Sequence, residues 1–194
     1  EKAVGNIGLE ELRCLLSASL LRSLLHGMGA AREQICANSV ATGVCARLLS
    51  RYCQKLGAGE AFLCGLVHDV GKVVMVRRDG RLYGKAIDLL ASGERTSIEA
   101  EEEIFELNHV EVGKWVAEKW RFPITTINAI AEHHQPWPAT PANRTNISLG
   151  LLIKAADTIA HAAGIGHPSH LRAFTRNFID QLPQAFAQFS LSTE

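Results

Sequence analysis

The sequence predicts an all-α protein, because apolar residues recur at helical spacing along most of the chain and glycines or prolines follow the apolar segments. The clearest segment spans residues 9–25, whose spaced apolar residues are Leu12, Leu15, Leu16, Leu20 and Leu24. Gly27 and Gly29 come directly after it, where glycine commonly ends a helix. The 194 residues contain no sequence repeat and no low-complexity tract, so we expect one helical core.

A second helix is expected over residues 32–56, and Gly57 and Gly59 would end it. Its spacing predicts an inward face made of Ile35, Val40, Val44, Leu48 and Leu49. The third helix, over residues 60–67, leads directly into a histidine and an aspartate. The apolar run 73–76 that follows is too short to distinguish a helix from a strand.

The rest of the chain continues the helical pattern after a charged stretch, 77–84, that predicts a turn. An acidic helix is expected to begin near Ser97. The helix expected over residues 110–120 would place Val112, Trp115, Val116 and Trp120 on one face. The expected elements are helices over 85–91, 96–108, 110–120, 124–134 and 147–163, a loop over 139–146, and one or two helices in a tail over 169–189.

The composition excludes several classes of protein. Hydrophobic residues make up 47% and charged residues 21%, which is typical of a globular protein. No apolar stretch reaches the roughly 18–20 residues that span a bilayer, and the polar start does not resemble a signal peptide, so we expect a cytoplasmic protein without membrane contact. The net charge of +0 argues against nucleic acid as a partner, although Arg77, Arg78, Arg81 and Lys85 cluster. The five cysteines form no Cys-x-x-Cys pair, which favours reduced core thiols.

The most informative pair is His68 and Asp69, which end an apolar run and precede Gly71 and Lys72. Burying an imidazole and a carboxylate is costly unless a partner satisfies them, and a metal ion is one such partner. Lys72 could stabilise a bound phosphate or another anion, or could face solvent as an ordinary lysine.

Four more side chains are candidate metal ligands. His109 follows Asn108, a residue that commonly begins helices, and could be a ligand or a surface residue. His133 and His134 end a helix, where a bending backbone lets both rings reach one ion; the alternative is that they cap carbonyl groups. Asp157 lies in an apolar run and needs either a metal or a cation, for which Lys154 is the alternative.

Four stretches of the sequence resemble the HD superfamily of metal-dependent phosphohydrolases, and more closely the HDOD domains of bacterial signalling proteins. They are GLVHDVGK at 65–72, NHVEVG at 108–113, WRFP at 120–123 and IAEHHQP at 130–136. GLEEL at 8–12 also resembles a helix start found midway through HDOD domains. The likeness extends from about Val4 to Gly166 and implies an HD-superfamily-like helical bundle. It also implies that earlier helices of the family, and a receiver or other sensory domain, precede this chain.

The resemblance assigns roles to the candidate residues. It implies a centre of one or two divalent ions, for which Fe, Mn or Zn suits histidine and carboxylate ligands better than calcium. Asp69 would bridge two ions and act with Lys72 in catalysis, Lys72 contacting the substrate phosphate. The implied ligands are His68 and Asp157 at one ion, and His109, His133 and His134 at the other.

Two departures from the catalytic relatives favour a regulatory role. Asn38 stands where catalytic HD proteins place a first histidine, and a neutral amide is a poor ligand for these metals. Relatives with the HD-GYP signature, in which a Gly-Tyr-Pro segment follows the histidine pair, hydrolyse cyclic di-GMP. No such segment follows His134, so specificity for cyclic di-GMP has no support. We therefore expect a bacterial signal-transduction module with a protein partner or an upstream sensory domain. The alternative is a metal-dependent phosphohydrolase acting on a nucleotide or other phosphoester. The expected domain covers residues 1–166, with a helical tail over 167–194 packed on it.

Overall fold

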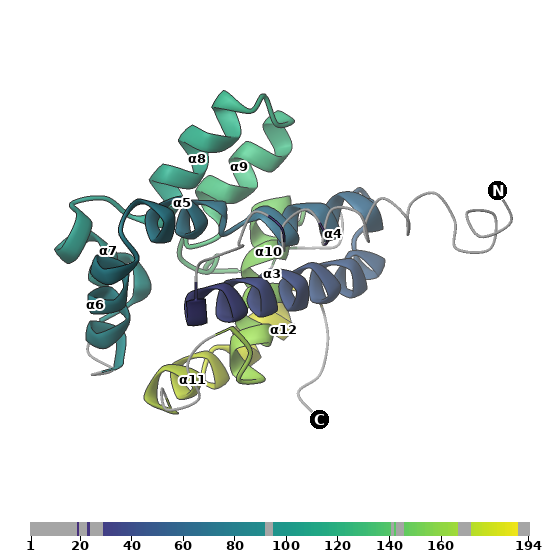
Figure 1. The fold of residues 1–194 in the computed structure, drawn as a ribbon. Helices are drawn as coiled ribbons and strands as arrows, with labels where there is room; N and C mark the ends of the chain where they lie inside the picture. Colours follow the sequence, from purple (N-terminus) through teal and green to yellow (C-terminus); the bar gives the residue numbers. More distant parts are fainter. Residues whose placement is uncertain are drawn as a thin grey trace, which may run out of the picture.

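The computed structural model describes residues 19, 23, 29–91, 95–140, 142, 146–166 and 172–189, and all regular structure in these ranges is helical, as predicted (Figure 1). The predicted helix over 9–25 lies outside the described residues except at Ser19 and Ser23, which are helical. None of the described helices is both long and apolar enough to cross a membrane. The elements are α3 (Gly29–Leu49), η1 (Ser50–Tyr52), α4 (Ala58–Val67), α5 (Val70–Arg78), α6 (Gly80–Ala91), α7 (Ser97–Phe105), α8 (His109–Lys119), α9 (Ile124–Glu132), α10 (Leu149–Ala162), α11 (Arg172–Ile179) and α12 (Leu182–Ala187).

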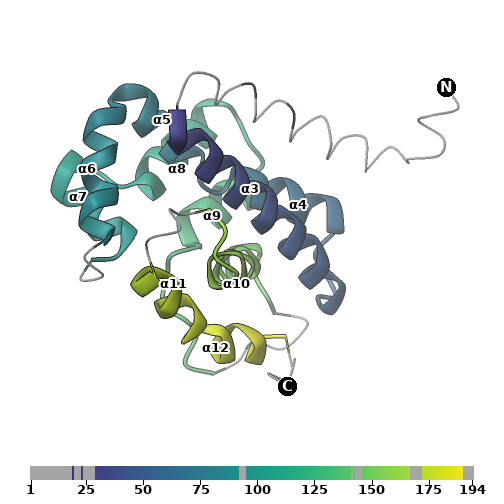
Figure 2. The same cartoon turned by 60° about the horizontal axis from the view of Figure 1, so that its bottom comes forward.

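Helix α10 contacts α3, α4, α9, α11 and α12 and is central to the largest part of the core (Figure 2). Leu152, Ile153, Ala155 and Ala156 on this helix are fully buried. Small side chains let the neighbouring helices approach closely, so Asp157, the next residue in the chain, is carried into the interior of the bundle.

Helices α5 and α8 approach each other closely because Gly71 has no side chain. A Cβ at Gly71 would overlap the carbonyl oxygen of His109 and lie 2.8 Å from the backbone nitrogen of Gly113. Asp69 directly precedes α5, and His109 is the first residue of α8. The close contact between these helices therefore brings the carboxylate and the imidazole together.

Helices α6 and α7 form a hairpin beside the rest of the bundle (Figure 1). Ala86, Leu90 and Ala100 form a small core of its own. The hairpin reaches the main bundle mainly through α5, and α7 leads directly into α8.

The structure corrects several predicted boundaries. The expected turn over 77–84 is wrong, because α5 continues to Arg78 and α6 begins at Gly80. Asp79 makes this abrupt start favourable, since its Oδ1 accepts hydrogen bonds from the backbone N–H groups of Arg81 and Leu82. The run 73–76 is helical. Helix α3 begins at Gly29, a residue expected to end the preceding helix, and it ends at Leu49 instead of continuing to residue 56.

Two predicted inward faces are partly wrong. Val44 and Leu48 of α3 are 45% and 49% exposed. Trp115 of α8 is 54% exposed, and Trp120, which follows that helix, is 51% exposed. Besides the predicted Ile35 and Leu49, the buried face of α3 contains Asn38, Ser39, Thr42, Gly43 and Ala46. The hydrophobic pattern of α3 therefore identified Ile35 and Leu49 correctly but missed the rest of the buried face, because close packing and polar contacts selected small and polar residues there.

Candidate metal centre

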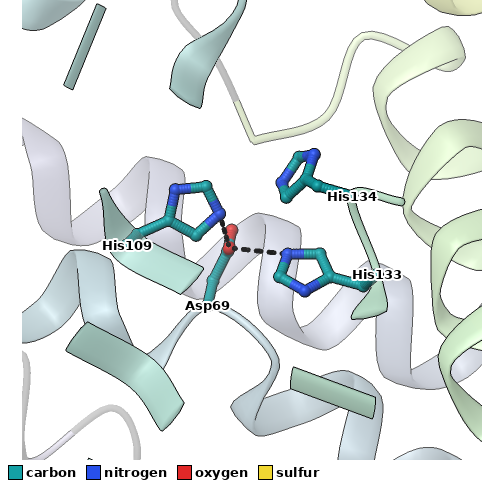
Figure 3. Close-up of side chains that lie close together, drawn as sticks. All are labelled: Asp69, His109, His133 and His134. Carbon is teal, nitrogen blue, oxygen red and sulfur yellow. Dashed lines mark ion pairs between the residues drawn. The ribbon is translucent and has the colours of Figure 1, made fainter. Parts of the chain in front are cut away.

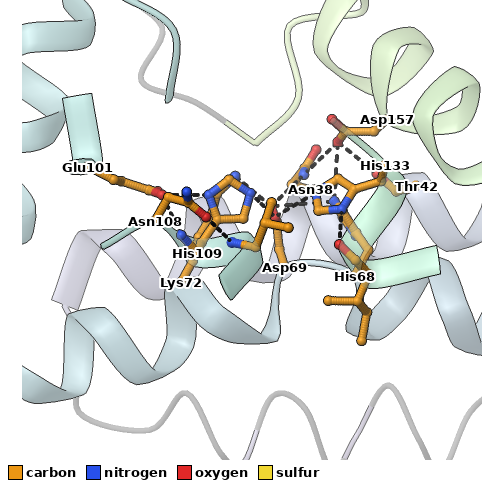
Figure 4. Close-up of polar contacts among 12 residues, drawn as sticks. Asn38, Thr42, His68, Asp69, Lys72, Glu101, Asn108, His109, His133 and Asp157 are labelled. Atoms are coloured by element: carbon orange, nitrogen blue, oxygen red, sulfur yellow. Dashed lines mark hydrogen bonds and ion pairs between the residues drawn. The ribbon is translucent and has the colours of Figure 1, made fainter. Parts of the chain in front are cut away.

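The six side chains predicted as ligands lie close together, most of them at helix ends. His68 follows the last residue of α4, Asp69 precedes α5, and His109 begins α8. His133 and His134 follow α9, where the helix gives way to a turn (Figure 3). Asp157 approaches the other side of the group from α10 (Figure 4).

Four of these residues form a compact set of donor atoms. One ligand atom from each of Asp69, His109, His133 and His134 lies within 4.8 Å of the other three. The Oδ1 atom of Asp69 is 3.3 Å from His109 Nε2 and 3.7 Å from His133 Nε2. These distances exceed those of good N–H···O hydrogen bonds, whereas two ligands that share an ion at about 2.1 Å are roughly 3 to 3.5 Å apart.

Hydrogen bonds at the far side of the rings orient two of the histidines toward this set. His133 Nδ1 is 2.7 Å from the carbonyl oxygen of Ile130, and His109 Nδ1 is 2.6 Å from Glu101 Oε2. A carbonyl oxygen can only accept, so His133 donates its Nδ1 proton and keeps a lone pair on Nε2. The predicted capping of a carbonyl and the predicted ligand role of His133 are therefore compatible.

The donor atoms have no other partner. Asp69 Oδ1 and the Nε2 atoms of His109, His133 and His134 are buried without a hydrogen bond. Each such atom costs about 1–3 kcal/mol when it is left unsatisfied. Four lone pairs that face one another favour a cation between them, so the residues present fit a divalent metal ion.

The protonation states agree with this fit. Burial lowers the pKa of His134 and His109 well below the ordinary histidine value, and neighbouring positive charges lower it further. Burial also lowers the pKa of His133, although Asp69 opposes it. Burial alone would raise the pKa of Asp69, but His68, Lys72 and His109 bring it well below the usual range. At neutral pH the set is one carboxylate and three neutral imidazoles, which are the forms that bind metals.

The side of the centre around Asp157 differs, because its carboxylate is already satisfied by side chains. Its Oδ1 accepts hydrogen bonds from Asn38 Nδ2 at 2.9 Å and Thr42 Oγ1 at 3.3 Å (Figure 4). The Nε2 atoms of His68 and His161 are each 3.4 Å from the same oxygen. Asn38 thus lies within the site, as the sequence comparison with catalytic HD proteins predicted.

Two basic side chains, Lys72 and His68, flank the carboxylates. Lys72 Nζ donates to Asp69 Oδ2 at 2.7 Å. Burial lowers the pKa of His68, but the Asp69 and Asp157 carboxylates outweigh it and the net shift is upward. His68 Nδ1 contacts the Gly65 carbonyl at 2.7 Å, so its Nε2 faces both carboxylates. Unlike the three neutral imidazoles, His68 therefore resembles a counter-ion to the two carboxylates.

The alternative partner that the sequence offered for Asp157 lies elsewhere. Lys154 Nζ is over the ring of Trp137, 4.8 Å from its centroid. Burial lowers the pKa of Lys154, and Asp157 only partly opposes this.

Sequence reasoning missed three residues that contact the site: Glu101, Thr42 and His161. None of the three is among the candidate site residues that the sequence predicts. His161 lies four residues after Asp157, a spacing that places two side chains on one face of a helix and could have identified it. Glu101 and Thr42 leave no comparable signal, because each reaches its partner through tertiary packing.

Residues 1–136 match the HDOD domain family, and the chain belongs to this family. An uncharacterized protein of Treponema pallidum (strain Nichols) is 27% identical over 135 residues. That alignment covers 69% of this chain but 26% of the relative, so the chain spans about a quarter of the length of the relative it matches.

Solved structures share the fold. An HDOD domain protein of unknown function from Geobacter sulfurreducens is similar with a TM-score of 0.72 and 23% identity, covering 96% of this chain and 71% of that one. A "putative phosphohydrolase" from Shewanella amazonensis has a TM-score of 0.64 and 20% sequence identity, and the match covers 97% of this chain and 74% of that one. The MmoQ response regulator from Methylococcus capsulatus has a TM-score of 0.57 and 21% sequence identity, and the match covers 83% of this chain and 58% of that one. These likenesses support the HD-like helical architecture that the sequence predicted.

Proposed function

We propose that this protein is a signal-transduction module of the HDOD family that binds one divalent metal ion through Asp69, His109, His133 and His134. The convergence of four buried, unsatisfied donor atoms carries the metal-binding part of the proposal. Support for a signalling role comes from family membership and from the response regulator among the proteins of similar fold. Its partner would be a protein or an upstream sensory domain.

The donor chemistry narrows the choice of metal. Three imidazole nitrogens and one carboxylate suit Fe, Mn or Zn, whereas calcium prefers an all-oxygen set. When bound, such an ion would supply Lewis-acid polarisation of a phosphoester or of water.

The charges around the two carboxylates favour one ion over two. The second oxygen of Asp69, Oδ2, accepts from Lys72 at 2.7 Å and is also 3.4 Å from Asn38 Nδ2. Asp157 Oδ1 is bonded to Asn38 and Thr42. A second ion on this side would have to displace these bonds and would lie beside the cationic Lys72.

The same arrangement makes a regulatory module the better-supported function. The resemblance gives Lys72 a contact with a substrate phosphate, but here its ammonium group is hydrogen-bonded to Asp69. Metal binding would then change the electrostatics and order of the helical bundle, and a protein partner or sensory domain would recognise that change.

A phosphohydrolase remains the second candidate because of the charge of the loaded centre. One carboxylate and three neutral imidazoles around a divalent ion leave a net charge of about +1, which attracts a phosphate anion. The catalytic residues in that case would be Asp69 and Lys72.

Elemental analysis of protein purified without chelators tests the proposal. We expect about one equivalent of Fe, Mn or Zn in the wild type, and much less after Asp69→Ala or His134→Ala. Asp88→Ala, which removes an exposed carboxylate from α6, is the matched control and should retain the metal. An absence of metal from folded wild type after exposure to all three ions would refute metal binding, and two equivalents would refute the single ion.

Hydrolysis assays on the loaded protein separate the two functions. We expect no turnover of p-nitrophenyl phosphate or bis-p-nitrophenyl phosphate above that of His134→Ala. Turnover that disappears in this variant would establish the phosphohydrolase instead.

We also propose that residues 167–194 are a helical tail of the same domain as residues 1–166. Support comes from α12 and the residues that follow it, since Ala185 of this helix and Phe189 after it are fully buried in the core that α10 forms. Loss of thermal stability on truncation after residue 166 tests this proposal, and an unchanged melting temperature would contradict it.

A further inference from the structure

Glu101 of α7 contacts the candidate ligand His109 through two atoms. Its Oε2 accepts a hydrogen bond from the His109 backbone N–H at 2.7 Å and lies 2.6 Å from His109 Nδ1 (Figure 4). The carboxylate is only 2% exposed, so burying it needs strong compensation. Both bonds go to the residue that begins α8, where the helix dipole also favours a negative charge.

The shared oxygen determines which ring nitrogen of His109 carries the proton. Oε2 accepts the backbone N–H, and an ionised carboxylate has no proton to donate, so Nδ1 donates the ring proton to it. The lone pair of His109 is therefore on Nε2, the atom 3.3 Å from Asp69 Oδ1 and without a hydrogen bond of its own. Without Glu101 the ring could adopt the other tautomer or rotate away.

We propose that Glu101 is a positioning residue for the metal centre, which holds His109 in the tautomer and orientation that ligation requires and strengthens its bond to the ion. The inference rests on the metal binding proposed above. It assigns a role in the site to a residue of α7, a helix that contributes none of the proposed ligands.

The chemistry of the acceptor distinguishes His109 from its neighbours. His68 and His133 contact backbone carbonyl oxygens through Nδ1, whereas His109 contacts a carboxylate. In its ionised form this carboxylate accepts a hydrogen bond about twice as strong as a neutral acceptor does, and it makes the ring a more basic ligand. Loss of Glu101 should therefore affect metal affinity without removing any ligand.

The attachment of Glu101 links the α6–α7 hairpin to the centre. Tyr83 of α6 is buried, and burial together with the nearby Glu101 carboxylate raises the pKa of its hydroxyl well above the usual value. The next residue, Glu102, accepts a 2.7 Å bond from Asn108, the residue that caps α8. Two adjacent side chains of α7 thus fix the start of α8, so metal binding and the order of α7 should be thermodynamically coupled.

Zn²⁺ affinity, measured by competition with a chromophoric chelator, tests the role of Glu101. We expect Glu101→Gln to weaken binding about 10-fold and Glu101→Ala up to about 100-fold, with the stoichiometry unchanged. Glutamine keeps an oxygen acceptor of the same shape, so this variant remains informative if alanine prevents folding. Glu103→Gln, on an exposed part of the same helix, should bind like the wild type. Wild-type affinity in folded Glu101→Ala or Glu101→Gln would overturn the proposal.

The ring nitrogens of His109 provide a readout that global destabilisation would not move. In ¹⁵N-labelled protein without metal, we expect a single Nδ1–H tautomer in the wild type and a mixture or the Nε2–H form in Glu101→Ala. A tautomer that stays the same in the variant would overturn the positioning role. Failure of the wild type to bind any of Zn²⁺, Fe²⁺ and Mn²⁺ would refute the proposed metal binding instead, and the tautomer experiment separates these two results.

Discussion

Replacing Gly71 with alanine tests whether the contact between α5 and α8 builds the metal centre. The added Cβ would overlap the His109 carbonyl oxygen and lie 2.8 Å from the Gly113 nitrogen. Both neighbours are backbone atoms, so no side chain can rotate away and the helices must separate. Asp69 and His109 lie at the starts of these helices, and their 3.3 Å contact must change with them.

The magnitude follows from two opposing effects. Alanine in place of glycine within a helix stabilises by about 1 kcal/mol, because it restricts the unfolded chain. Overpacking in a close-packed interior typically costs about 1–3 kcal/mol, and contact with rigid backbone favours the upper end or beyond. We expect a net destabilisation of about 1–2 kcal/mol, together with weaker Zn²⁺ binding.

Gly84→Ala is the matched control, since Gly84 is also helical but a Cβ there would meet nothing within 4 Å. This variant should be more stable than the wild type by up to about 1 kcal/mol. Urea denaturation, followed by circular dichroism at 222 nm, measures the free energy of unfolding of the wild type and both variants. The free energies of the two variants should differ by about 2–3 kcal/mol. If Gly71→Ala equals Gly84→Ala in stability and binds Zn²⁺ like the wild type, the packing argument is wrong.

Three further predictions concern single side chains. Asn38→Ala should destabilise the protein by about 1–3 kcal/mol in urea denaturation, because it removes the 2.9 Å hydrogen bond to the buried Asp157 carboxylate; a change below about 0.5 kcal/mol would contradict this. Asn108→Ala should cost about 1–2 kcal/mol in the same measurement and weaken Zn²⁺ binding, since Asn108 caps α8 in front of His109, and unchanged stability would show that the cap contributes nothing. Burial raises the pKa of Cys64 from 9.0 to about 12, so the folded state keeps this thiol protonated where the unfolded chain ionises it. Stability should therefore fall as pH rises from about 9 toward 12, by about 1.4 kcal/mol per unit for this group, and a fall of equal steepness in Cys64→Ala would exclude Cys64 as its cause.

Much of the site could be predicted from sequence because its residues occupy positions with local signatures. His68 and Asp69 end an apolar run. Asn108 is a typical N-cap residue and predicts that a helix begins at His109. His133 and His134 precede a proline turn. Each signal is contained within a few residues. The sequence therefore determined the all-α class and the six candidate ligands, which the structure brings into one group.

Only the tertiary structure decided which residues complete the centre and how its two sides differ. Glu101 meets His109 because α7 folds back on α8, and Thr42 meets Asp157 across 115 residues of sequence. The same holds for the buried side of α3, where close packing selected polar and small residues that hydrophobic periodicity did not place on the inward face. Periodicity reports the average polarity around a helix, whereas hydrogen bonds and steric fit between distant helices depend on three-dimensional positions that no local pattern contains.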